Sequence, residues 1–159
     1  MIDPGGPASD FTLSDQDGDP VALSELRGRW VALYFYPKAD TPGCTKQACG
    51  VRDHSADYEA ANAVVLGVSP DPVPELRAFA DKYGLPFTLL SDEEHEVAAA
   101  YGVWREFSIG DQTKWGNERS TVLIDPDGTV ARVFPRVDPA SHDELVLGAL
   151  AEVGAPRTG

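Results

Sequence analysis

Long apolar runs and cysteines are both scarce in this chain. No stretch approaches the roughly 18 consecutive apolar residues that a membrane-spanning helix needs. Residues 1–6 carry neither the cationic start nor the apolar core of a signal peptide. We therefore expect a cytoplasmic protein that has no membrane partner.

Basic residues are also few. Lysine and arginine number 13 against 26 aspartates and glutamates, which gives a net charge of −13 at pH 7. Binding to nucleic acid or to an anionic membrane needs clusters of lysine and arginine that neutralise phosphate. Both classes of partner are therefore excluded, and the excess of acidic residues indicates a well-solvated surface.

The length of 159 residues is enough to bury one sizeable core. We predict a single domain over residues 1–159, with an ordered core from about residue 9 to residue 154. Strand-like and helix-like segments alternate through the middle of the chain, and a hairpin and a helix close it. This order predicts an α/β sandwich with a mixed central sheet and an N-terminal β-hairpin.

Two segments give the clearest strand signals. The apolar, aromatic-rich run from Trp30 to Tyr36 is typical of a buried central strand. The turn Asp125-Pro126-Asp127-Gly128 separates two strands of a hairpin. The strands of this hairpin are 120–124 and 129–134, and the other predicted strands are 11–13, 21–23, 63–68 and 87–90. Helices are predicted over 44–61, 72–82, 91–101 and 141–154, and a loop over 103–118.

Three signals mark the ends of predicted helices. Ser91-Asp92-Glu93-Glu94 and Ser141-His142-Asp143-Glu144 have the spacing of capping boxes, which satisfy the first N–H groups of a helix. Gly84 suits the end of the helix before it, because glycine readily adopts the left-handed conformation found there.

Both cysteines of the chain lie in one short segment, at Cys44 and Cys49. Cys44 follows Pro42 and Gly43, where a helix is expected to begin. A thiol at a helix N-terminus meets unpaired N–H groups and the positive end of the helix dipole, which favour the nucleophilic thiolate. In a cytosolic domain such a pair indicates a catalytic, redox or metal-binding role rather than a permanent disulfide.

The residues around Cys44 resemble the active site of a known family. Pro37-x3-Thr41-x2-Cys44 matches the signature of the peroxiredoxins, and the string from Thr41 to Cys49 resembles their PrxQ, or bacterioferritin-comigratory-protein, branch. The segment Arg119–Asp125 resembles the strand that carries the active-site arginine of that family. The resemblance runs from Phe11 to about Val153 and implies a thioredoxin-like fold with an N-terminal extension.

The resemblance implies a thiol peroxidase that needs no cofactor and reduces hydrogen peroxide and organic hydroperoxides. Cys44 attacks the terminal peroxide oxygen and becomes a sulfenic acid. Thr41, which also suits a helix N-cap, hydrogen-bonds the peroxide and the thiolate. Arg119 brings a fixed positive charge to the thiolate and to the oxygen on which negative charge develops.

Two further residues complete the candidate site. Pro37 has no N–H and a fixed φ, and by resemblance it shields the thiolate and shapes the pocket. Gly43 lacks a side chain, so peroxide oxygen can approach the backbone N–H groups of Gly43 and Cys44.

By the same resemblance, Cys49 is the resolving cysteine, and thioredoxin or a similar dithiol protein reduces the disulfide between Cys44 and Cys49. The resemblance also implies a monomer or weak dimer. Helix geometry adds a condition. Five helical residues separate two Cα atoms by nearly 9 Å, whereas a disulfide needs them within about 7 Å. We therefore expect the first turns of the helix to unwind after oxidation, and Gly50 to ease the unwinding.

Alternatives to the peroxidase stay open. A thioredoxin-like disulfide oxidoreductase normally uses Cys-x-x-Cys, but Thr41 stands where the first cysteine of that motif would be. A peroxide sensor would share the chemistry of Cys44 without turning over with thioredoxin. A holdase-like chaperone would not need the thiols at all.

A metal site is not expected. Cys44, Cys49 and His54 follow one another at intervals of five residues, and five helical residues rotate by about 140°, so the three side chains would point apart. They would also lack a fourth ligand. The histidines at positions 54, 95 and 142 are instead expected on the surface.

Overall fold

The fold is built on one large sheet. The computed structural model describes residues 1–153, apart from the side chain of Ile109, and so leaves the predicted helix end at Gly154 outside the described residues. The strands of the sheet are β1 (Thr12–Asp15), β2 (Pro20–Ala22), β3 (Trp30–Phe35), β4 (Ala63–Ser69), β5 (Thr88–Ser91), β8 (Ser120–Ile124) and β9 (Val130–Phe134). Their order is β2-β1-β5-β4-β3-β8-β9. β3, β4 and β5 are parallel and the other pairings are antiparallel, which confirms the mixed sheet and the N-terminal hairpin.

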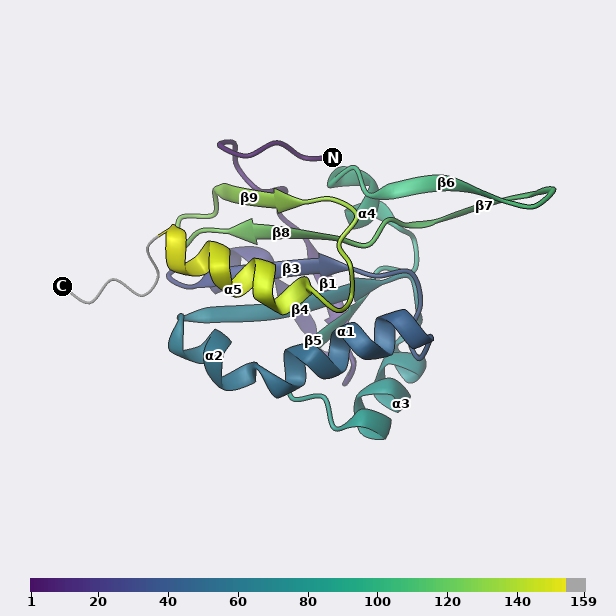
Figure 1. Cartoon of the computed structure of the whole chain (residues 1–159), viewed down its shortest axis with the longest axis horizontal. Helices are drawn as coiled ribbons and strands as arrows, with labels where there is room; N and C mark the ends of the chain where they lie inside the picture. Colours follow the sequence, from purple (N-terminus) through teal and green to yellow (C-terminus); the bar gives the residue numbers. More distant parts are fainter. Residues whose placement is uncertain (154–159) are drawn as a thin grey trace.

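Helices cover both faces of this sheet. They are α1 (Pro42–Asp53), α2 (Ser55–Ala60), α3 (Val73–Tyr83), α4 (Glu96–Ala100), α5 (His142–Glu152) and a short 3-10 helix, η1 (Leu23–Leu26). α1, α2, α3 and α5 lie in front of the sheet, and α4 lies behind it (Figure 1). Among the described residues, no helix combines the length and apolar character required to cross a membrane.

Strand β3 shows how the sequence divides the core into two layers. Successive residues of a strand face opposite sides of a sheet. Ala32 and Tyr34 therefore pack with Cys44 and the helices in front, whereas Leu33 and Phe35 pack behind. Every one of these residues is buried, as predicted for a central strand whose two faces are both covered.

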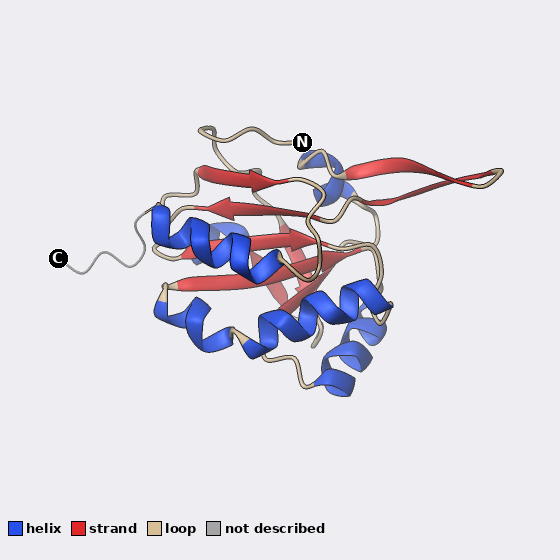
Figure 2. Ribbon diagram, in the orientation of Figure 1, coloured by secondary structure: helices blue, strands red, loops and turns tan. Residues whose placement is uncertain are grey.

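The parallel strands create the edge on which the candidate site lies. Because β3, β4 and β5 run in the same direction, their C-terminal ends meet at one side of the molecule (Figure 2). The chain leaves β3 at this edge, passes through residues 36–41 and begins α1 there. The first turn of α1 therefore lies near the C-terminal edge of the parallel strands.

The predicted helix from residue 44 to residue 61 is in fact two helices. It begins earlier, at Pro42, and is interrupted at His54, where φ is −105° and ψ is 14°. The N–H of His54 still bonds to Gly50 O and its carbonyl accepts from Tyr58 N, so the interruption is slight. Figure 1 accordingly shows α1 and α2 following one another along the same face of the sheet.

The loop predicted over residues 103–118 is wrong. These residues form a separate hairpin, β6 (Trp104–Ile109) and β7 (Gln112–Asn117), which projects from the body (Figure 1). Most of the hairpin is exposed on both faces, so its residues lack the apolar alternation that identifies a half-buried strand. The overlooked signal is the dipeptide Gly110-Asp111 between the strands, a typical two-residue hairpin turn.

The capping boxes predicted at Ser91 and Ser141 do not form. Ser91 is the last residue of β5, and α4 is capped instead by the Asp92 carboxylate, which accepts from the N–H groups of Val97 at 3.3 Å and Ala98 at 2.9 Å. Ser141 is the N-cap of α5, but its side chain makes no capping hydrogen bond. The predicted end of α3 is confirmed by the left-handed C-cap that follows it, with φ of +59°.

Candidate active site

Cys44 is buried in the first turn of α1, with 2% of its surface exposed. Thr41 is the N-cap residue, with extended φ and ψ of −93° and 157°, and Pro42 opens the helix. N–H groups in a first helical turn have no acceptor within the helix. A negatively charged sulfur or oxygen at this point is therefore stabilised by backbone donors and by the helix dipole.

The Thr41 hydroxyl is directed back across the turn. It donates to Lys38 O at 2.9 Å and does not bond a helix N–H, so Thr41 caps α1 through its backbone only. A hydroxyl that donates once still has lone pairs for accepting. Pro37 is exposed two residues after the end of β3, on the approach to the same turn.

Two buried side chains fix the segment between β3 and α1. The Asn117 amide donates to Tyr36 O at 3.2 Å and to Val68 O at 3.4 Å, and so joins the ends of β3 and β4. The Asp71 carboxylate accepts from the backbone N–H of Ala39 at 2.7 Å. These contacts hold the backbone that presents Pro37 and Thr41.

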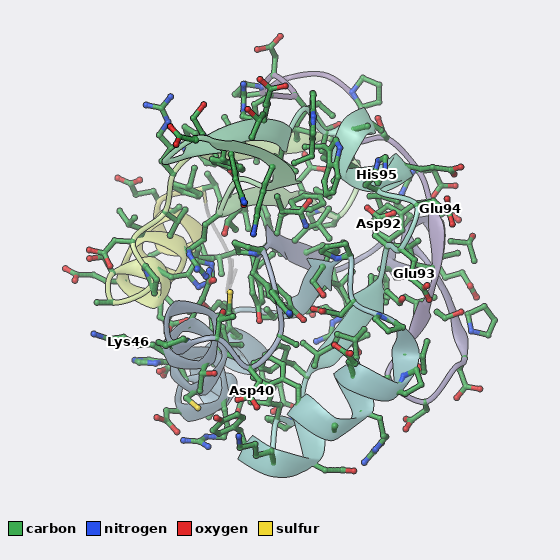
Figure 3. The ribbon with its side chains drawn as sticks, turned by 90° about the vertical axis from the view of Figure 1, so that its right-hand side faces the viewer. Asp40, Lys46, Asp92, Glu93, Glu94 and His95 are labelled. Carbon is green, nitrogen blue, oxygen red and sulfur yellow. The ribbon has the colours of Figure 1, made fainter. Side chains whose placement is uncertain are left out.

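Asp40 holds the same segment from outside. Its φ of 60° is left-handed, a strained conformation for a residue with a side chain. Its carboxylate accepts from Lys82 Nζ at 2.8 Å and from the Tyr83 hydroxyl at 2.6 Å, both on α3. Figure 3 looks onto this edge of the sheet, with Asp40 and Lys46 at the start of α1 and Asp92–His95 in the turn after β5.

Arg119 reaches across the first turn of α1. Its Nη1 donates to Oε1 of Gln47 at 2.8 Å. Its Nη2 would lie only 3.0 Å from a Cβ placed on Gly43. The guanidinium thus contacts α1 just before Cys44 and one turn after it, and the missing side chain of Gly43 gives it room. The sequence assigned Gly43 to the approach of substrate, whereas the structure uses the space for Arg119.

Gln47 was not identified from the sequence. It is completely buried, and its Nε2 has no hydrogen-bond partner within the described part of the chain. Its Oε1 is the side-chain acceptor that orients Arg119. The signal that could have found it is its position three residues after Cys44, which puts both side chains on one face of the helix.

Two tyrosines of the buried layer lie close to Cys44. The hydroxyls of Tyr34 and Tyr36 are buried without a hydrogen-bond partner among the described residues. Burial above all raises the pKa of both phenols, and the proximity of Cys44 raises each further. The two hydroxyls therefore stay neutral at physiological pH and surround the thiol with uncharged groups.

Cys49 lies in the same helix but is separate from these groups. Both cysteines are free thiols, Cys44 buried and Cys49 partly exposed. α1 is continuous from Pro42 to Asp53, so the five-residue separation corresponds to nearly 9 Å between Cα atoms. The structure therefore brings Cys44, Thr41, Gly43 and Arg119 together, with Pro37 at the rim, and leaves Cys49 outside.

The surface position predicted for His142 is wrong. His142 has no exposed surface, and its Nε2 lies 2.9 Å from the Thr121 hydroxyl. Burial lowers the pKa of His142 to about 4, with a contribution from the positive charge of Arg119. His142 is therefore a neutral core residue at physiological pH, whereas His54 and His95 are exposed as predicted.

Within residues 1–153, three carboxylates come close enough together to suggest a metal ion. Ligand atoms of Asp15, Asp17 and Asp19 lie within 4.8 Å of one another in the turn between β1 and β2. One Asp15 oxygen already accepts from the backbone N–H groups of Asp17 and Asp19, and Arg77 pairs with Asp17. This arrangement is explained by the turn itself.

Known proteins resemble this chain over nearly its whole length. The AhpC/TSA family model matches residues 4–133. Peroxiredoxin Bcp of Escherichia coli (strain K12) is 47% identical over 148 residues, which are 93% of this chain and 95% of that protein.

Solved structures show the same likeness. A cysteine-to-serine mutant of PrxQ from Xylella fastidiosa aligns with a TM-score of 0.92 and 30% identity, over 97% of this chain and 98% of that one. The bacterioferritin comigratory protein of Xanthomonas campestris aligns with a TM-score of 0.88 and 33% identity, over 95% and 99% of the two chains. The predicted thioredoxin-like fold is confirmed.

Proposed function

The chain belongs to the AhpC/TSA family and is a peroxiredoxin with PrxQ and bacterioferritin comigratory proteins as structural neighbours, and from this premise we propose that it reduces hydroperoxides by an atypical two-cysteine cycle. Its relatives support thiol-dependent peroxidase activity. The observation that carries the proposal is the contact of the Arg119 guanidinium with the helical turn that holds the buried Cys44.

The first step oxidises Cys44. Its thiolate attacks the terminal oxygen of the peroxide, an S–O bond forms, and the O–O bond breaks. The departing oxygen leaves with the electron pair of that bond and becomes water or an alcohol on protonation. Arg119 and the N–H groups at the start of α1 stabilise the negative charge on this oxygen, and the Thr41 hydroxyl accepts from the peroxide O–H.

We infer that both hydrogen peroxide and organic hydroperoxides are substrates. The structure of the Xanthomonas campestris relative concerns its alkyl peroxide reduction activity. The edge position of the site supports the same range for this chain, because Pro37 and Thr41 lie where the chain leaves β3 and not inside a closed cavity. A substituent on the distal oxygen can then extend into solvent.

The second step joins the two sulfurs. The Cys49 thiolate attacks the sulfur of the Cys44 sulfenic acid, an S–S bond forms, and hydroxide leaves to become water. Thioredoxin or a similar dithiol protein then supplies two electrons and restores both thiols. Such a cycle suits a monomer or weak dimer in a reducing compartment such as the cytoplasm.

The cycle is tested by intact mass. Reduced protein is mixed with one equivalent of hydrogen peroxide, alongside Cys44→Ser and Cys49→Ser. We expect the wild type to lose two hydrogens, Cys49→Ser to gain one oxygen, and Cys44→Ser to stay unchanged. A wild type that keeps both thiols for minutes would contradict the proposal, and a disulfide that thioredoxin cannot reduce would favour a peroxide sensor.

A further inference from the structure

A buried carboxylate from another helix packs against α1 at Gly50, the residue after Cys49. Asp143, in the first turn of α5, has a side chain that is 12% exposed. A Cβ placed on Gly50 would lie 2.5 Å from its Oδ2, closer than real Cβ contacts come. A side chain at position 50 would therefore force this carboxylate to move. α1 and α5 pack side by side in front of the sheet (Figure 1).

The carboxylate contacts one group on α2 and one at the junction of α1 and α2. The buried hydroxyl of Tyr58, on α2, donates to Oδ1 of Asp143 at 2.6 Å. Nδ1 of His54 lies 3.6 Å from Oδ2 and also 2.9 Å from the carbonyl oxygen of Gly50. We call Asp143, Tyr58, His54 and Gly50 the Asp143 clasp. The clasp connects the second half of α1 to α2 and α5.

Resolution requires movement next to this clasp. In the intact helix the Cα atoms of Cys44 and Cys49 are nearly 9 Å apart, and a disulfide needs about 7 Å or less. Cys49 is bonded to Gly50, so unwinding that carries Cys49 toward Cys44 pulls Gly50 away from the carboxylate. The carboxylate then loses its packing against Gly50. Because the ring of His54 also contacts the Gly50 carbonyl, the 3.6 Å approach of that ring to the carboxylate is disturbed as well. A buried carboxylate that loses such contacts is destabilised, which opposes this movement.

We propose that Asp143 is a positioning residue for the resolution step: its clasp holds the second half of α1 and so limits how often Cys49 reaches the oxidised Cys44. The inference rests on the proposed function, because it names the residue that controls one step of that cycle. In this arrangement the intact helix holds Arg119 and the first turn in the geometry that reacts with peroxide. The contacts of the clasp must then break before the disulfide can form.

The test separates the two chemical steps. Disulfide formation after one equivalent of hydrogen peroxide is followed by rapid acid quenching and intact mass for Asp143→Ala, Tyr58→Phe and the exposed neighbour Glu144→Gln. The rate of Cys44 oxidation is measured for the same substitutions in a Cys49→Ser background. Asp143→Ala is expected to form the disulfide about tenfold faster, the effect of losing a hydrogen-bonded charged group, with Cys44 oxidation unchanged.

Tyr58→Phe removes one hydrogen bond and keeps the ring, so it is expected to accelerate disulfide formation less than Asp143→Ala does. This variant also tests the inference if Asp143→Ala does not fold. Amide exchange over residues 48–53 of the reduced protein should quicken in both variants and not in Glu144→Gln. Resolution at the wild-type rate or slower in the folded variants overturns the inference and leaves the peroxidase cycle intact. A wild type that forms no disulfide overturns the cycle itself, and the inference with it.

Discussion

In α1, the half that carries Cys44 and the half that carries Cys49 differ in burial and in the charge that faces them. Cys44 and Gln47 are buried, and the cation of Arg119 contacts this half at Gly43 and Gln47. Cys49 is partly exposed, and the carboxyl group of Asp143 contacts the following residue, Gly50.

The difference teaches how one helix can serve two thiols. A cation beside the first turn favours the negative sulfur and oxygen atoms of the peroxide reaction. The carboxylate beside the second half packs against the backbone at Gly50 instead. Both contacts are made at a glycine. A Cβ would lie 3.0 Å from the Arg119 guanidinium at Gly43 and 2.5 Å from the Asp143 carboxylate at Gly50.

The largest effect is expected from removing the cation. Arg119→Gln should lower the rate of Cys44 oxidation by about a hundredfold, the usual cost of losing one donor to a developing negative charge. The rate is measured with hydrogen peroxide in the Cys49→Ser background, with Arg132→Gln as a control because Arg132 is exposed on β9. If Arg132→Gln lowered the rate of Cys44 oxidation equally, the rate would depend on the net charge of the protein and not on the contact of Arg119 with the first turn of α1.

His142, which precedes Asp143 on α5, makes the stability of the protein depend on pH in the acid range. The pKa of His142 is lowered to about 4 from an ordinary value of 6.5. The unfolded chain therefore binds more protons between these values, so the free energy of unfolding falls as pH drops from 6.5 toward 4, by up to about 3 kcal/mol. Urea unfolding of the wild type and of His142→Gln at pH 7 and pH 4.5 measures this contribution.

The wild type should lose more stability than His142→Gln over that pH range, since the variant has no imidazole to protonate. Parallel pH dependence in the two proteins would show that other groups account for acid unfolding.

A tenfold effect is expected from the group that orients the cation. Gln47→Met keeps the volume of the side chain but leaves Arg119 without its buried acceptor, so Cys44 oxidation should slow by about tenfold. In an Arg119→Gln background the same substitution should cost little more, because the cation that Gln47 orients is already absent. Both rates are measured with Cys49→Ser present, and a full tenfold loss in the Arg119→Gln background as well would show that the role of Gln47 is packing alone.

The smallest expected effect concerns the contact between Gly50 and Asp143 in the second half of α1. Gly50→Ala should destabilise the otherwise wild-type chain by roughly 1 kcal/mol, because the new Cβ meets the Asp143 carboxylate. In an Asp143→Ala background the space is free, and the same change should stabilise the protein by about 0.5–1 kcal/mol, since alanine favours helix over glycine. Denaturant unfolding of the four proteins gives both values, and changes of the same sign would contradict direct contact.

Local patterns made much of this molecule predictable. Cys44 and Thr41 lie three residues apart, so one turn of helix relates them, and the apolar run of β3 identifies a central strand without any knowledge of its neighbours. Arg119 was predicted only through the resemblance of its strand to a known family, because most arginines lie on the surface.

The parts that could not be predicted depend on contacts between distant segments. Arg119 and Gln47 are 72 positions apart, and Tyr58 and Asp143 are 85 apart. No periodicity in either segment identifies the partner, and His142 was predicted on the surface because its burial depends on Thr121 of another element. The hairpin β6–β7 was missed for the opposite reason, since it packs too little of its surface to show a pattern.

The presence of both thiols on α1 has a kinetic consequence. If Cys49 resolves Cys44, the step is a first-order rearrangement within one molecule, and its rate does not change on dilution. A tethered group so close behaves as though present at millimolar concentration or higher. Diluting the enzyme should therefore slow only the encounters with peroxide and with the dithiol reductant.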